Sequence, residues 1–121
     1  MSTLRVNTLQ DATGSNQPAM VGAAKAWVNF DGTGTVAIRE QFNVSSITDN
    51  GTGDYTVNFT NAMVDANYSA VSGTYDSTWL GNFAMARPET VSTARVNGQY
   101  MHGTGVSDPR DVNQCCVAIF R

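Results

Sequence analysis

The residues that could do chemistry lie close together near the C-terminal end of the sequence. His102 is the only histidine of the 121 residues, and Ser107 and Asp108 follow it. A hydrolytic triad needs a histidine base that a carboxylate orients, and a serine whose hydroxyl is activated in a rigid turn. No serine motif of that kind occurs in the sequence. The sequence therefore favours a protein that is not an enzyme, with His102 at a surface or an interface.

Metal chemistry finds little support in the sequence. The oxygen ligands of residues 49–54 could hold Ca²⁺, but the segment lacks the ligand spacing and the closing glutamate of a calcium loop. Turn formation explains the same residues without a metal ion. Cys115 and Cys116 are adjacent and have no second Cys or His pair, so we interpret them as small buried apolar residues. We expect no cofactor and no metal ion.

Recognition is the chemistry that the sequence supports best. Aromatic faces stack on sugar C–H groups, and Asp and Asn side chains bond to hydroxyls. Large aromatics are concentrated in residues 76–88, the least regular stretch, and binding residues tend to lie on such loops of a β scaffold. The predicted receptor-contact residues are Tyr75, Asp76, Trp79, Asn82, Tyr100 and His102. The alternative is that Trp79 and Phe83 plug one end of the fold or a subunit interface.

Charge and hydropathy argue against several classes of partner. The formal charge is −3, from 7 basic and 10 acidic residues, and no Lys/Arg cluster occurs. We therefore expect no nucleic-acid partner and no binding to an anionic membrane. No apolar run approaches the roughly 18 residues of a membrane span, so we expect no membrane insertion. The N-terminus has no apolar signal core, so the protein is expected to stay in the cytosol where it is made or to leave without a signal peptide.

The element that should organise the fold is a β-hairpin at residues 41–60. Its second arm alternates, with Tyr55, Val57 and Phe59 on one face. Residues 48–54 tolerate positive φ and allow the chain to reverse. Phe42 and Val44 are assigned to one face of the first arm. Because Ile47 is out of phase with them, we expect a bulge or a change of sheet near residues 45–47.

Other segments also have the pattern of short strands separated by Gly, Asp and Asn turns. They are residues 25–30, 35–40, 67–75, 92–101 and 113–120. The last of these is apolar on both faces, as in an interior strand or one that faces a subunit interface. Residues 62–66 are expected to form a loop or a single helical turn, and residues 102–111 a loop. The pattern predicts an all-β fold, an antiparallel β-sandwich or jelly-roll-like domain.

The first 22 residues differ from the rest of the chain. Leu4, Val6 and Leu9 belong to one possible strand, which a polar, turn-forming segment follows. A lone strand is not stable by itself and must dock elsewhere. We interpret residues 1–22 as an attachment or oligomerisation arm and residues 23–121 as the sandwich domain. Leu, Ile, Val and Phe are sparse, which suits a thin β protein that completes its core by assembling with copies of itself.

Two blocks of the sequence resemble a known family. Residues 27–39, WVNFDGTGTVAIR, and residues 42–59, FNVSSITDNGTGDYTVNF, resemble a module of bacteriophage tail-fibre and related structural proteins, notably of marine and cyanobacterial phages. Residues 4–14 are similar to the lead-in that often precedes that module. The resemblance covers mostly residues 3–68. It implies a virion component, usually a homotrimer, that serves adhesion or structure, and it transfers no catalytic residue. The module commonly ends a much longer fibre, whereas here it stands almost alone.

Two functions follow as expectations. The first is a virion protein, made in the host cytoplasm, that adheres to a host cell-surface glycan or protein. Its arm would bind other virion proteins, and its copies would form a homotrimer. The alternative is a capsid-decorating (cement or head-fibre) or fibre-linking trimer that binds virion proteins only.

Overall fold

Alternating apolar and polar side chains produce strands throughout the part of the chain that the computed structural model describes, residues 2–3, 23–78 and 81–121. Within these residues nine strands form, and no helix does. They are β1 (Ala24–Asp31), β2 (Ala37–Phe42), β3 (Val44–Gly51), β4 (Asp54–Phe59), β5 (Ser69–Tyr75), β6 (Asn82–Pro88), β7 (Thr93–Met101), β8 (Ser107–Pro109) and β9 (Gln114–Phe120). The predicted all-β class is confirmed. The predicted arm residues Leu4, Val6 and Leu9 lie outside the described residues.

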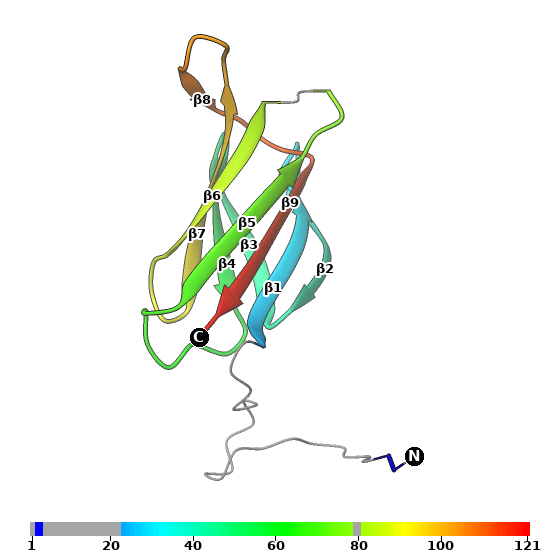
Figure 1. The fold of residues 1–121 in the computed structure, drawn as a ribbon, viewed down its shortest axis with the longest axis vertical. Helices are drawn as coiled ribbons and strands as arrows, with labels where there is room; N and C mark the ends of the chain where they lie inside the picture. Colours follow the sequence, from blue (N-terminus) through cyan, green and yellow to red (C-terminus); the bar gives the residue numbers. More distant parts are fainter. Residues whose placement is uncertain (1, 4–22, 79–80) are drawn as a thin grey trace.

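The strands pair into two antiparallel sheets that form a β-sandwich (Figure 1). One sheet has the order β2-β1-β9-β5, and the other has the order β3-β4-β7-β6, with β8 pairing to β7. Strand β9 lies between β1 and β5, so the prediction of an interior strand is confirmed. Strands β5 and β6 are edges of different sheets, and the Ser72 hydroxyl donates to the Ala84 carbonyl at 3.0 Å between them.

The core lies between the two sheets and consists of inward strand residues together with loop residues such as Val112. Its largest fully buried side chains are Tyr55, Phe30, Ile119, Val28, Val57, Val96, Val112 and Cys115. The rings of Phe30 and Tyr55 meet edge to face with centroids 5.2 Å apart, a geometry that aromatic quadrupoles favour. The face predicted for the second hairpin arm, with Tyr55, Val57 and Phe59 together, is thereby confirmed as the buried one.

The chain passes from one sheet to the other at Asn43, between β2 and β3. Asn43 has φ 55°, and its side-chain nitrogen Nδ2 donates to the backbone carbonyls of Lys25 and Asn61 at 3.0 and 3.1 Å. The pairing register shifts between Val44 and Ser46, which confirms the predicted bulge. The assignment of Phe42 and Val44 to one face is wrong, because Phe42 is 51% exposed and Val44 is buried. The positive φ of the residue between them turns the strand.

Two segments predicted to be irregular contain strands. The prediction for residues 76–88 is wrong where β6 pairs with β7 from Asn82 to Pro88. The inward residues of β6 are Ala84 and Ala86, whose small side chains give only a weak alternating signal. The loop predicted at 102–111 likewise contains the short strand β8.

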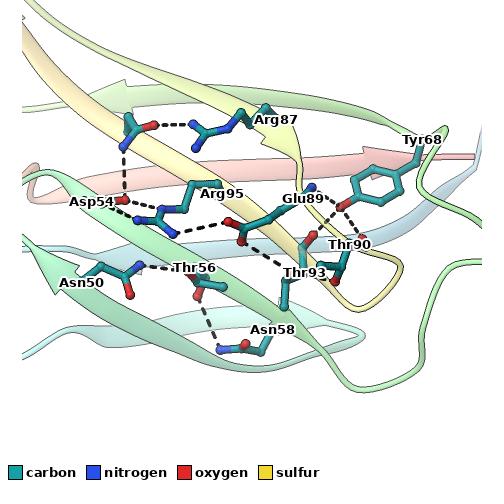
Figure 2. Close-up of polar contacts among 11 residues, drawn as sticks. Asn50, Asp54, Thr56, Asn58, Tyr68, Arg87, Glu89, Thr90, Thr93 and Arg95 are labelled. Carbon is teal, nitrogen blue, oxygen red and sulfur yellow. Dashed lines mark hydrogen bonds and ion pairs between the residues drawn. The ribbon is translucent and has the colours of Figure 1, made fainter.

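A polar network covers much of the outer face of the β3-β4-β7-β6 sheet, where Met85 is also exposed (Figure 2). Arg95 makes two hydrogen bonds to the Asp54 carboxylate, at 2.5 and 2.6 Å, and approaches Glu89 at 3.4 Å. Arg87 donates to the Asn97 side chain at 2.7 Å, and Asn97 donates to Asp54 at 3.2 Å. The hydrogen bond from Arg95 lowers the pKa of Asp54. Charges on this face are therefore satisfied within the chain.

A second ion pair ties the loop after β4 to the end of the chain and predicts a loss of stability in acid. The guanidinium of Arg121 donates to both carboxylate oxygens of Asp65, at 2.9 and 2.8 Å. Hydrogen bonds from Arg121, and then from the Asn67 amide, lower the pKa of Asp65 from 3.8 to about 2. The folded-state pKa lies below the unfolded one, so the contribution is present above pH about 4 and is lost as pH falls toward about 2.

Thermal unfolding across this range should show the effect. The midpoint temperature of wild-type unfolding should fall on acidification, and Asp65→Asn should reduce the pH dependence of this temperature. Arg121→Gln should act in the same way, since it removes the partner of the carboxylate. An unchanged pH dependence in both variants would contradict the assignment.

Candidate functional site

Five candidate recognition residues, which are Tyr75, Asp76, Asn82, Tyr100 and His102, lie near the end of β5, the start of β6 and the end of β7, at one end of the sandwich (Figure 1). The register pairs Ala24 with Phe120 at one end of the β2-β1-β9-β5 sheet and Tyr75 with Gln114 at the other. The β5–β6 and β7–β8 connections lie at the end where β5 finishes. We call this the loop end. The start of β1 and the C-terminal residue Arg121 lie at the opposite end.

Four side chains form a cluster at the loop end, which we call the Tyr100 cluster: Tyr100, His102, Asp108 and Arg110. The Tyr100 and His102 rings meet edge to face with centroids 4.9 Å apart. His102 Nε2 lies 2.7 Å from Asp108 Oδ2, and the Arg110 guanidinium carbon lies 5.7 Å from the Tyr100 ring centre. The cluster thus combines an aromatic ring with a cation, a carboxylate and an imidazole.

The β7–β8 hairpin creates the cluster. The His102 amide donates to the Val106 carbonyl at 2.8 Å, and the Gly105 amide donates to the His102 carbonyl at 3.0 Å. Gly105 has φ 81°, a value that glycine adopts without strain. The reversal places Asp108 directly opposite Tyr100 in the register, so Asp108 reaches the histidine that follows Tyr100 by two residues.

Asn82 lies beside this cluster and opposite Tyr100 on β6. Its side-chain amide nitrogen and oxygen are buried, and neither has a hydrogen-bond partner among the described residues. The preceding residue, Gly81, lies close to the end of β7: its carbonyl accepts from the Met101 amide at 3.0 Å, and an added Cβ would lie 2.9 Å from the Met101 carbonyl. Three of the predicted residues, Asn82, Tyr100 and His102, are therefore brought together.

The other predicted residues occupy different positions. Tyr75 ends β5 and is 61% exposed. The Asp76 carboxylate accepts from the Thr78 amide at 2.8 Å and so stabilises the local turn. Trp79 lies outside the described residues. In the alternative, Trp79 and Phe83 plug one end of the sandwich. Of these two residues the structure describes Phe83, which is half-buried on β6 and pairs with Gln99.

Asp108 and Arg110 were not among the residues predicted for the site. The sequence suggested Asp108 only as a member of a triad with Ser107 and His102. Asp108 contacts His102, while Ser107 makes no hydrogen bond to the ring in the described part of the chain. The side chains of His102 and Asp108 are 46% and 65% exposed, so both can reach a ligand at the surface.

A network of largely buried hydrogen bonds lies next to the loop end, on its core side. The Tyr55 hydroxyl lies 2.7 Å from Asp111 Oδ1 and 3.0 Å from the Gly32 carbonyl. The Gly53 amide donates to the same Asp111 oxygen at 2.7 Å. Burial, and then the hydrogen bond to Asp111, raise the pKa of Tyr55 far above its usual value, so the phenol stays neutral. The network fixes the segment that carries Arg110.

The acidic turn and the two cysteines have roles that the geometry explains. Asp49 accepts from the Gly51 amide at 2.9 Å within the hairpin turn, and Asp54 faces Arg95. In the described residues, no group of three or more His, Cys, Asp or Glu side chains could hold a metal ion.

Cys115 is buried, and burial raises the pKa of its thiol to about 12. The prediction that both cysteines are buried is wrong for Cys116, which is exposed on the other face of β9.

The chain was also compared with known proteins. Comparisons with models of protein families, with curated proteins and with solved structures each found no match. In the part of the chain that the structure describes, no helix is long and apolar enough to cross a membrane.

Proposed function

We propose that this chain is a non-enzymatic structural protein of a bacteriophage particle, a tail-fibre-like module for adhesion to the host surface. It assembles as a homotrimer, and residues 1–22 attach it to other virion proteins. The observation that carries the proposal is the separation of its two ends: the chain enters β1 at one end, and the Tyr100 cluster lies at the other (Figure 1). A module anchored by its N-terminal arm would turn this cluster away from the particle.

The chemistry of the Tyr100 cluster fits a polar ligand such as a cell-surface glycan. Sugars offer C–H faces to an aromatic ring and hydroxyls to ionised side chains. The cluster supplies the ring of Tyr100, the carboxylate of Asp108 and the guanidinium of Arg110. Tyrosine and arginine are also the residues that most often dominate binding energies at protein surfaces. The buried network beneath Arg110 holds these groups in place before a ligand arrives, which lowers the entropy cost of binding.

Binding of purified, labelled protein to a panel of marine bacteria, cyanobacteria included, tests the proposal. His102→Ala and Asp108→Ala should each weaken binding by about 10-fold, because contacts of this kind contribute about 1–2 kcal/mol. Both side chains are exposed, so the variants should fold normally, which circular dichroism can verify. Val64→Ala is the control, since this 73% exposed valine lies in the loop between β4 and β5, away from the cluster.

Two results would contradict adhesion through this end. One is equal cell binding by wild type and both cluster variants. The other is an absence of cell binding together with binding to particles that lack the protein. That second result would indicate the decorating or fibre-linking function, in which the protein stabilises a lattice by binding only assembled sites.

A further inference from the structure

An apolar row crosses the outer face of the β2-β1-β9-β5 sheet. The registers place Phe42 opposite Trp27, Trp27 opposite Ala118, and Ala118 opposite Val71. Directly paired residues of antiparallel strands point to the same face, so these four side chains form one line across all four strands. Phe42, Trp27 and Val71 are 51%, 38% and 52% exposed. We call this line the apolar row.

A shallow depression of about 430 Å³ adjoins the row, between Trp27 on β1 and Val71 on β5. Small residues form its floor: Ala118 and Cys116 on β9, and Gly73 on β5. No atom lies within 4 Å of the position that a Cβ on Gly73 would occupy. One half of the face therefore projects bulky rings, and the other half is hollow.

The charges of this face favour burial against a copy of itself. Strands β5 and β9, SAVSGTY and QCCVAIF, contain no charged residue. Strands β1 and β2 carry Lys25, Asp31, Arg39 and Glu40, whose formal charges sum to zero, and Arg39 pairs with Asp31 at 3.3 Å. Two copies can thus meet without net repulsion and without burying an unpaired charge on the β5–β9 half. The outer face of the other sheet carries the Arg95 network beside the exposed Met85 (Figure 2).

The size of the face approaches that of a contact between proteins. Four strands about 4.8 Å apart, each of about seven residues with a rise of about 3.3 Å, cover roughly 450 Å² per copy. Two such faces bury about 900 Å² of flat area, and side-chain relief adds to it. The flat area alone is below the roughly 1,200 Å² at which standard specific interfaces begin, so the relief of the projecting Trp27, Phe42 and Val71 side chains has to supply the difference.

We propose that the outer face of the β2-β1-β9-β5 sheet is the contact between copies of this chain, with Trp27 and Phe42 of one copy packed into the depression of the next. The inference depends on the self-assembly in the proposed function and assigns it to a surface. It places Cys116 inside the contact and leaves the Tyr100 cluster outside it.

Sedimentation of the full chain over a range of concentrations tests the contact. The wild type should associate, and Val71→Asp should weaken association at least 100-fold, because it buries a charge in an apolar contact. Val91→Asp is the matched control: Val91 is 41% exposed in the loop between β6 and β7, and its substitution should leave association unchanged. Circular dichroism establishes that both variants fold.

Cys116 provides a second readout within the same protein. Its thiol is exposed in the single chain, whereas Cys115 is buried and should not react. In the assembled wild type, Cys116 should react with a thiol reagent at least 10-fold more slowly than in Val71→Asp. Assembly with an equally reactive Cys116, or assembly that Val71→Asp does not weaken, would overturn the assignment and leave self-assembly intact. A wild type that stays monomeric at all concentrations would overturn both.

Discussion

Replacing Gly53 by alanine should lower the free energy of unfolding by about 3 kcal/mol, through positive-φ strain and backbone overlap together. Gly53 has φ 65°, where a side chain is strained. An added Cβ would overlap the Gly98 carbonyl oxygen and lie 2.5 Å from the Arg110 amide nitrogen. These backbone atoms cannot easily move, because the Gly98 amide donates to the Gly53 carbonyl at 2.9 Å and the Arg110 amide donates to the Gly98 carbonyl at 3.0 Å.

Gly34→Ala is the matched control for this change. Gly34 has φ 59°, but no atom lies within 4 Å of its added Cβ. It should therefore show the positive-φ cost alone, about 1 kcal/mol. Urea unfolding of both variants measures the difference. Equal losses at the two positions would show that the close approach of the three backbone segments does not restrict Gly53.

Tyr55→Phe should cost about 1–3 kcal/mol, the usual cost when a buried hydrogen bond loses one partner. The variant keeps the ring that packs against Phe30 and removes only the hydroxyl between Asp111 and the Gly32 carbonyl. Asp111 would retain the Gly53 amide as a donor. The loss of unfolding free energy should therefore stay well below the loss that an unpaired buried charge would cause.

Tyr75→Phe makes the same chemical change at an exposed position. Tyr75 is 61% exposed, so its variant should unfold within about 0.5 kcal/mol of the wild type. Thermal or urea unfolding of the two variants side by side isolates the value of the buried hydroxyl. If both unfold like the wild type, the Tyr55 network contributes nothing to stability.

The sequence predicts the parts of the fold in which one face of a strand is buried and the other is polar. Tyr55, Val57 and Phe59 show this pattern, and β4 follows it. It fails for β6, because the inward alanines are small and pairing with β7 forms the strand. It also fails at Phe42. The positive φ of Asn43 turns the strand between Phe42 and Val44, and the two-residue spacing of these apolar side chains gives no sign of that turn.

The candidate surfaces were predictable only in part. Of the residues predicted to contact a receptor, Tyr100 and His102 lie together at the loop end. The participation of Asp108 depends on the register that places it opposite Tyr100, which no local pattern reveals. The apolar row is harder still, since each of its four strands contributes a single residue. Only the order of the strands and their alignment bring those residues into line.

The position of Arg121 beside the start of β1 has a practical consequence for measuring adhesion. A biotinylated tag added after Arg121 would fix the protein to a sensor chip by the end opposite the Tyr100 cluster. The immobilised layer would then display the cluster toward the flowing analyte. Coupling through Lys25, the single lysine of the sequence, would instead set the outer face of β1, which we propose as the contact between copies, against the sensor. Oriented capture would thus reproduce on a chip the presentation that we propose for the particle.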